Sequence, residues 1–119
     1  MNKKEKETGF SSPAQGYEEN SLDFNRILLK NPPATFIMEA AASGMEWRGI
    51  FPGSLLVVDR SIKPETGAVV VAAYDGEFLC REMEIKNKQI SFINGNNTIT
   101  PGEGEAVIFG TVRAVVTLL

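Results

Sequence analysis

The sequence predicts a mostly β fold: a small antiparallel β domain with one short N-terminal helix and a flexible N-terminal arm. From residue 35 onward, short segments rich in Val, Ile and Phe alternate with turn residues, which is the pattern of successive strands. The Asp-Gly pair at 75–76 lies between two such segments and is a strong signal for a two-residue hairpin turn. A chain of 119 residues is long enough for one domain with its own hydrophobic core.

The start of the chain differs from the rest. Residues 1–20 are polar, contain Gly and Pro and show no apolar periodicity, so we expect a flexible arm. A short helix is expected over residues 21–30, and the Asn-Pro-Pro at 31–33 ends it. Three apolar residues recur there at helical spacing and share one face: Phe24, Ile27 and Leu28. The β domain is therefore expected over residues 21–119, with the helix at its beginning.

Six strands are expected after the helix, over residues 35–39, 54–59, 68–74, 77–85, 89–93 and 106–119. Asn87-Lys88 should form a second turn, while 94–97 and 100–105 should form loops. Side chains in 77–85 alternate between two faces, and Arg81 falls on the face of its apolar neighbours Leu79, Met83 and Ile85. An arginine in that setting is unusual.

The composition excludes several classes of site. The net charge is −3 with no evident basic face, which argues against direct binding of nucleic acid through phosphate contacts. The chain has no histidine and only one cysteine, Cys80, so Ser-His-Asp and Cys-His chemistry are absent and a zinc site is not expected. We therefore expect no cofactor and no metal. Cys80 is expected to pack as a small core residue.

The same features bear on location. A single cysteine allows no internal disulfide, which suits a reducing compartment. The N-terminus has no apolar core after its charges and does not resemble a signal peptide. The longest apolar runs are too short to span a bilayer. We expect a cytoplasmic protein without membrane contact.

Five stretches of the chain resemble the LexA/UmuD family of self-cleaving serine-lysine peptidases, and its UmuD members most closely. These stretches are GFSSPA (9–14), DFNRILLKNPPATF (23–36), GMEWRGIFPGSLLVVDRSI (44–62), AAYDGEF (72–78) and VIFGTV (107–112). The likeness covers nearly all of residues 9–119. It implies the small β fold shared by LexA and signal peptidases.

The resemblance also implies a catalytic site. In the family a Gly-Asp-Ser-Met run presents the nucleophile, and a lysine just after the Asp-Gly hairpin is its base. The corresponding residues here are Gly44 and Arg81. Glycine has no hydroxyl, and arginine stays protonated at physiological pH and cannot act as a general base. Because the loss of either member removes most of the rate, we expect no peptidase activity.

Several alternatives bear on this interpretation. Ser43 could replace the nucleophile, but a shift of one residue on an extended segment points the side chain to the other face. An engineered serine replacement is a second alternative, although the lysine and the flanking Gly-Asp have changed too. Met45 and Trp47 are candidates for cleft or partner contacts, and a plain half-buried loop position is an equal alternative for Trp47. For Arg81 we expect a packed stem with its head in water or paired with a carboxylate.

The arm carries a remnant of the family's cleavage region. Relatives are cut before a glycine, and the matching bond here joins Thr8 to Gly9. Cleavage of this bond in trans by a competent relative is one possibility, and a plain disordered tail is the favoured one. Only eight residues precede Gly9, so the chain is expected to resemble the processed form of the family.

These features together predict a UmuD′-like accessory protein of the SOS response to DNA damage. The resemblance implies a homodimer that binds a UmuC-like error-prone polymerase and supports translesion synthesis at a RecA filament. The dimer interface is expected near residues 107–119, because a long apolar edge strand needs a partner. Two alternatives remain: an active self-cleaving peptidase with an irregular dyad, and a regulator that forms mixed dimers with a competent UmuD- or LexA-like protein.

Overall fold

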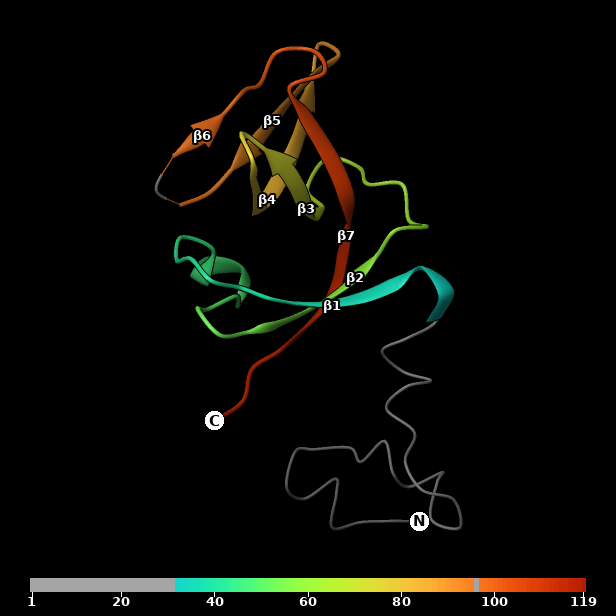
Figure 1. The fold of residues 1–119 in the computed structure, drawn as a ribbon. Helices are drawn as coiled ribbons and strands as arrows, with labels where there is room; N and C mark the ends of the chain where they lie inside the picture. The colour runs from blue at the N-terminus through green and yellow to red at the C-terminus, as the bar shows by residue number, and fades with distance from the viewer. Residues whose placement is uncertain (1–31, 96) are drawn as a thin grey trace, which may run out of the picture.

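A computed structural model describes residues 32–95 and 97–119, and these form a strongly bent β sheet (Figure 1). The prediction of a mostly antiparallel β fold is confirmed. The arm, with Thr8 and Gly9, and the predicted helix at 21–30 lie outside the described residues. Described residues include two short 3-10 helices, η2 (Pro32–Ala34) and η3 (Glu46–Arg48).

Seven strands make up the sheet, in the order β1-β2-β7-β3-β4-β5-β6 with antiparallel neighbours throughout. Their bounds are β1 (Thr35–Glu39), β2 (Leu55–Asp59), β3 (Val69–Tyr74), β4 (Glu77–Lys86), β5 (Gln89–Ile93), β6 (Thr98–Ile99) and β7 (Ala106–Val116). Six of them match the expected segments to within one residue at each end, except that β7 ends three residues early. Strand β6 was not predicted, because two residues are too few for an alternation signal.

Strand β7 runs through both parts of the sheet (Figure 1). Its residues 106–111 pair with β3, and its residues 111–116 pair with β2. The expectation that this segment is an edge strand was therefore wrong, since β7 lies between β2 and β3. The backbones approach closely where the partner changes: a Cβ at Gly110 would lie 2.7 Å from Cγ1 of Val58. Only glycine fits this crossing without displacing β2.

Both predicted hairpin turns are present. Asp75 and Gly76 have φ values of 51° and 79°, and Asn87 and Lys88 have 53° and 65°. Positive φ at both central residues is typical of a type I′ turn, whose twist matches that of the flanking strands. These turns place β4 between β3 and β5.

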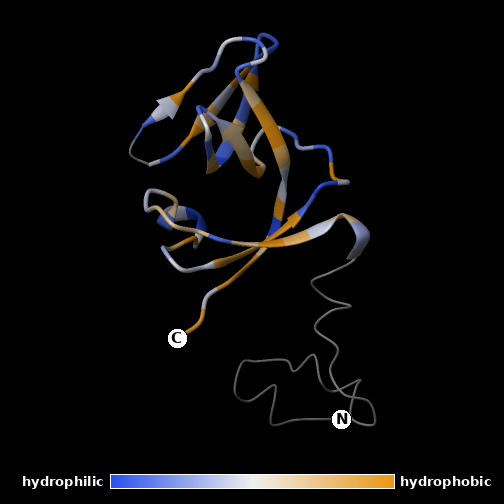
Figure 2. Ribbon diagram, viewed as in Figure 1, coloured by the Kyte–Doolittle hydropathy of each residue, from blue (hydrophilic) through white to orange (hydrophobic). Residues whose placement is uncertain are grey.

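The core consists of two clusters on opposite faces of β3. Val69 and Val71 belong to the first cluster, and Val70 and Ala72 belong to the second, so side chains of both parities are buried. Figure 2 shows the corresponding hydrophobic colour along the central strands. Full burial of each valine contributes about 1.5–3 kcal/mol. A continuous apolar run of this kind is what a strand covered on both faces requires.

None of the helices in residues 32–95 and 97–119 has the length and apolar character needed to cross a membrane.

Candidate functional site

The segment between β1 and β2, which contains Ser43 and Gly44, is anchored to the core. Met45 and Ile50 are 3% and 2% exposed and belong to the first core cluster. The amide of Ala40 donates to the carbonyl of Ser54 at 2.8 Å, and the amide of Gly53 donates back to the carbonyl of Ala40 at 2.7 Å. These two hydrogen bonds close the loop that contains the Met-x3-Gly-Ile-x2-Gly motif.

Two glycines of that spacing adopt backbone conformations that other residues avoid. Gly49 ends η3 in the left-handed region with φ 78°, and Gly53 has φ 91°. Gly76, in the first hairpin turn, likewise has a positive φ of 79°, a region that glycine adopts without steric cost. A Cβ at Gly49 or Gly53 would meet no atom within 4 Å, so conformation alone favours glycine there.

Gly44, which the resemblance places at the nucleophile position, differs from Gly49 and Gly53 in its surroundings. It is buried and has φ 112°, and a Cβ there would lie 2.1 Å from Oδ1 and 2.4 Å from Nδ2 of Asn94. Its amide donates to Oε1 of Glu46 at 2.7 Å, and its carbonyl accepts from the amide of Gly95 at 2.7 Å. Both the backbone conformation and the space around it therefore fit glycine.

Arg81, which the resemblance places at the base position, lies on β4 opposite Val70. Its Nη1 donates to Oδ1 of Asn97 at 2.6 Å and to the carbonyl of Asn97 at 3.3 Å. The head group is therefore bonded to an amide and a carbonyl, where we had expected water or a carboxylate. Partial burial lowers the pKa of Arg81 from its ordinary value, yet a guanidinium remains protonated at neutral pH.

A cleft of about 500 Å³ brings several of the sequence-predicted residues together. Ser43, Met45 and Arg81 line it, along with Asn94 and residues of β1, β2, β3 and β4. Ser43 is exposed at this cleft, and its carbonyl accepts a bond from Nδ2 of Asn94 at 3.3 Å. Glu39 also lines the cleft, and the remaining walls are apolar: Ile37, Met38, Ala40, Ala41, Ala42, Ile50, Leu56, Val71, Phe78, Leu79 and Cys80. The cleft therefore offers a largely apolar surface with one cationic side chain, Arg81, and one anionic side chain, Glu39.

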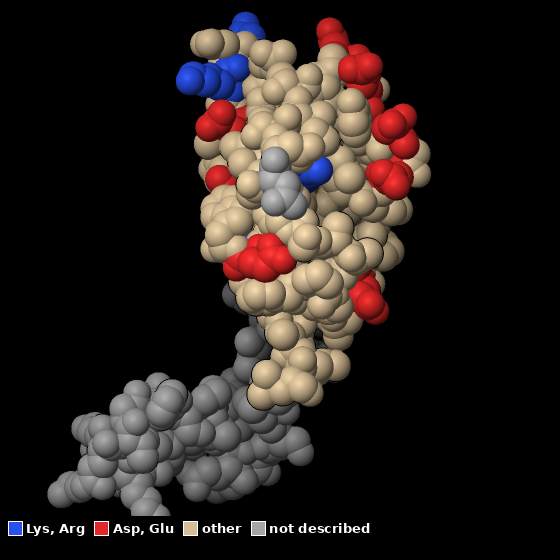
Figure 3. Space-filling model, turned by 90° about the vertical axis from the view of Figure 1, so that its left-hand side faces the viewer, with Lys and Arg blue, Asp and Glu red and all other residues tan. Residues whose placement is uncertain are grey.

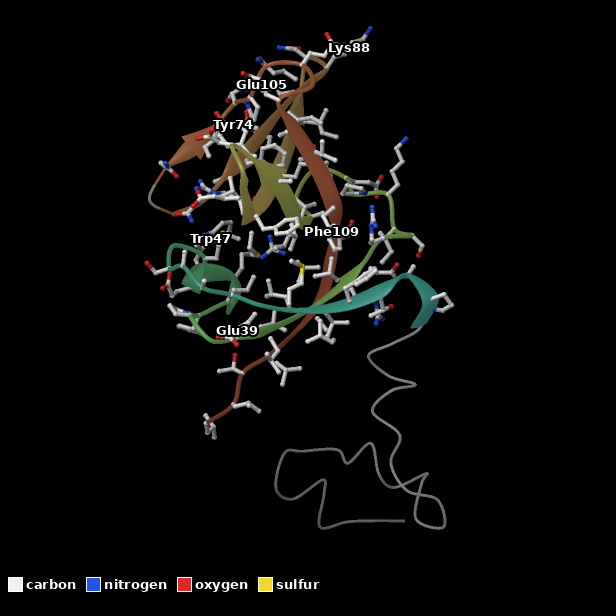
Figure 4. All side chains as sticks on the ribbon, in the orientation of Figure 1. Glu39, Trp47, Tyr74, Lys88, Glu105 and Phe109 are labelled. Atoms are coloured by element: carbon white, nitrogen blue, oxygen red, sulfur yellow. The ribbon has the colours of Figure 1, made fainter. Side chains whose placement is uncertain are left out.

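Trp47 lies on η3 beside the cleft rather than among the residues that line it (Figure 4). Its side chain is 53% exposed, and its Cδ1 lies 3.6 Å from the Cβ position of Gly95. The neighbouring Arg48 packs its guanidinium 5.7 Å from the Trp47 ring and forms an ion pair with Glu82. Trp47 therefore covers the backbone of the loop after β5.

An aromatic cluster joins three strands of the sheet, β1, β7 and β4. The ring of Phe109 lies between those of Phe36 and Phe78, with centroids 5.3 Å and 5.5 Å away in edge-to-face geometry (Figure 4). The guanidinium of Arg60 lies 4.5 Å from the Phe109 ring centroid. These contacts link β1 and β4 to β7.

Cys80 packs against the first core cluster, as expected for a small core residue. Burial raises the pKa of its thiol to about 11, while the charge of Arg81 opposes that shift. The thiol is therefore protonated at neutral pH and is a poor nucleophile. In the described part of the chain, His, Cys, Asp and Glu side chains form no group of three that could hold a metal ion.

The face shown in Figure 3 carries most of its charge at the margins, where acidic side chains predominate, and its centre consists largely of uncharged residues. A positively charged groove of the kind that tracks a nucleic-acid backbone is not visible on this face.

Sequence reasoning missed three residues that matter at this site. Asn94, Asn97 and Glu46 all bond to the nucleophile loop or the base position. The Asn-Gly pair at 94–95 signals a turn, but nothing local shows that this turn reaches a loop fifty residues earlier. Long-range contacts of this kind do not affect the apolar periodicity of the sequence.

Comparison with known families identifies the chain. Residues 3–113 match the family described as Peptidase S24-like. The chain belongs to the peptidase S24-like family. This match covers most of the sequence and confirms the resemblance to LexA and UmuD proteins. The peptidase S24-like fold is thus present, with glycine and arginine at the two positions compared above.

Several named proteins are similar to this peptidase S24-like chain. Protein SamA of Salmonella typhimurium is 38% identical over 111 residues, which is 91% of this chain and 77% of SamA. Protein ImpA of Escherichia coli is 41% identical over 80 residues, 67% of this chain and 55% of ImpA. Protein MucA of Escherichia coli is 38% identical over 78 residues, 66% of this chain and 53% of MucA. The chain thus matches little more than half the length of ImpA and MucA.

Proposed function

We propose that this chain is a non-cleaving peptidase S24-like accessory protein of the SOS response, which dimerises and binds an error-prone translesion polymerase. The observation that carries the proposal is the state of the two catalytic positions. Gly44 brings no hydroxyl, and the Arg81 guanidinium is already bonded to Asn97. Neither group can perform the proton transfer that a serine-lysine pair needs.

The geometry around Gly44 supports the loss of activity in a second way. Ser43, the nearest hydroxyl, is exposed and its backbone carbonyl is bonded to Asn94. A nucleophile needs a base within hydrogen-bond reach, about 2.6–3.2 Å. Arg81 is the basic side chain of this cleft, and it stays protonated.

Strand β7 supports dimerisation, although not for the reason expected from the sequence. Residues 112–116 pair with β2 and, among the described residues, have no strand on their other side. Leu118, just beyond this half-edge, is 75% exposed. A second copy that adds its own residues 112–116 would cover this edge. The proposed interface is therefore the C-terminal half of β7.

The polymerase and RecA parts of the proposal rest on family membership, because the chain resembles UmuD proteins over most of its length. The chain is acidic overall, so any contact with DNA would go through these partners.

Intact mass tests the loss of activity. The purified chain is incubated alone at alkaline pH, and then with activated RecA filament at neutral pH. We expect the mass to stay unchanged in both. Loss of the first eight residues in the chain alone would contradict the proposal. Co-purification with a UmuC-like polymerase, compared with a chain carrying Leu118→Lys at the exposed position just beyond the half-edge of β7, tests the binding part.

The open cleft favours a second candidate function. A cleft of about 500 Å³ remains, so the chain could receive the arm of a competent relative without cutting it. The chain would then regulate that relative through mixed dimers. Mixing with a cleavage-competent UmuD-like protein separates the two functions. Slower processing of the partner, or a cut after Thr8 of this chain, would favour the regulator.

A further inference from the structure

We propose that Asn94 is a third inactivating residue, whose side chain occupies the space that a nucleophile at position 44 would need. The inference rests on the proposed function, because it explains how the lost site is now filled. Asn94 lies outside the catalytic pair that the resemblance implies. It predicts that restoring serine and lysine at positions 44 and 81 does not restore a usable site.

A side chain at position 44 would clash with Asn94. Three atoms of the Asn94 side chain, Oδ1, Nδ2 and Cγ, would lie 2.1, 2.4 and 2.5 Å from a Cβ at Gly44. Carbon atoms in ordinary contact are about 3.5–4.0 Å apart, so these distances are far inside the repulsive range. A serine at position 44 therefore needs Asn94 to leave its place.

Hydrogen bonds hold both the side chain and the backbone of Asn94. Its Nδ2 donates to the carbonyl of Ser43 at 3.3 Å, and its amide donates to the carbonyl of Asn97 at 2.9 Å. The next residue, Gly95, donates its amide to the carbonyl of Gly44 at 2.7 Å. Moving the Asn94 side chain away would break its hydrogen bond to Ser43 and disturb the adjacent bond from Gly95 to Gly44.

The turn that contains Asn94 also contacts Arg81, the proposed base position. Asn97 closes the turn by donating its amide to the carbonyl of Asn94 at 3.1 Å, and its own side chain accepts from Arg81 at 2.6 Å. Residues at the two ends of one short turn thus contact both former catalytic positions. The turn links them in place of the hydrogen bond that a serine-lysine pair would form.

A double-mutant cycle in urea unfolding tests the proposal. Gly44→Ser is introduced into the natural chain and into an Asn94→Ala chain, which lacks all three clashing atoms. We expect Gly44→Ser to raise the unfolding equilibrium constant at least about tenfold more in the natural chain than in the Asn94→Ala chain, as is common for residues in contact. The same variant folding only in the Asn94→Ala chain is equivalent support.

A matched control separates the clash from backbone strain. Gly53 has a comparable positive φ of 91°, but a Cβ there meets nothing within 4 Å. Gly53→Ser should therefore cost the same in both backgrounds. An equal cost of Gly44→Ser in both backgrounds, including failure to fold in both, would overturn the proposal, because φ alone would then account for the glycine.

A second measurement addresses the catalytic consequence. The chain carrying Gly44→Ser and Arg81→Lys is incubated at alkaline pH and followed by intact mass. It is expected to stay uncut, and cleavage would overturn the role of Asn94. The proposed function fails independently: it fails if the natural chain cleaves itself, whatever the coupling between positions 44 and 94.

Discussion

Arg81 on β4 and Asn97 in the turn before β6 are joined by a hydrogen bond of 2.6 Å between Nη1 and Oδ1. The bond ties β4 to the turn after β5, whose Asn94 side chain lies against Gly44. The charged donor makes it stronger than a bond between neutral groups, and partial exposure weakens that advantage.

Asn97→Ala should lower the free energy of unfolding by about 1 kcal/mol, because the guanidinium loses a charge-assisted partner at a partly exposed site. Arg81→Met, which keeps much of the stem but has no donors, is the matched variant. The two changes together should cost less than their sum, since each removes the same bond. Additive costs in urea unfolding would show that the bond contributes nothing.

Stability should depend on Asp59 in a specific pH range. The Ser61 hydroxyl, at 2.6 Å, and the Ser61 amide, at 2.8 Å, donate to its carboxylate, and together with Arg113 they lower its pKa below the ordinary value. A lowered folded pKa stabilises the protein above the unfolded pKa of about 3.9, and this contribution is lost as the pH falls further.

Asp59→Asn should therefore destabilise the chain at pH 7 and differ less from the natural chain at pH 3. Urea unfolding at both values measures the difference. Ser61→Ala, which removes the hydroxyl donor alone, should give a smaller effect of the same sign. A stability gap between the natural chain and the Asp59→Asn chain that is equally wide at both pH values would contradict the linkage.

Cys80 should react slowly in the folded chain. Its pKa is raised from 9.0 to about 11, so the thiolate fraction at pH 8 falls about a hundredfold. An aromatic disulfide reagent should therefore modify the folded protein at least about a hundredfold more slowly than the urea-unfolded protein. Equal rates would mean that the thiol reaches solvent. The raised pKa also implies that stability declines as the pH rises above 9.0.

Truncation along one face of β4 should have very different costs at its middle and at its end. Met83 is 1% exposed in the second core cluster, whereas Ile85, two residues along on the same face, is 44% exposed. Met83→Ala should cost about 2–5 kcal/mol because it leaves a cavity, and Ile85→Ala should cost less than about 1 kcal/mol. Chemical denaturation of both variants makes the comparison, and similar costs would mean that the end of β4 is packed as tightly as its middle.

Local chemistry predicted much of this fold. The strands at 35–39 and 89–93 have the predicted bounds, and the turns at 75–76 and 87–88 are present, because alternation and positive-φ residues are properties of neighbouring positions. The place of β7 was not predicted. Its apolar length suggested an exposed edge, yet the same property also suits a strand covered on both sides.

The candidate site was predicted in part. The resemblance predicted a site at Gly44 and Arg81, and the structure brings Ser43 and Met45, which flank Gly44, into one cleft with Arg81. The contacts of Asn94 and Asn97 could not be foreseen, since they join this turn to a loop 51 residues earlier and to a strand 16 residues earlier. Such contacts depend on the path of the whole sheet.

Strand β7 has a consequence for how the chain acquires its fold. Strands β1 and β2 reach β3 and its neighbours through β7, which follows all of them in the sequence. During synthesis the hairpin of β3 and β4 can form early, but the two halves of the sheet stay separate until residues 106–116 leave the ribosome. Nascent chains interrupted before that point would expose the valines of β2 and β3 and the open edges of both halves, which makes them substrates for chaperones and for aggregation.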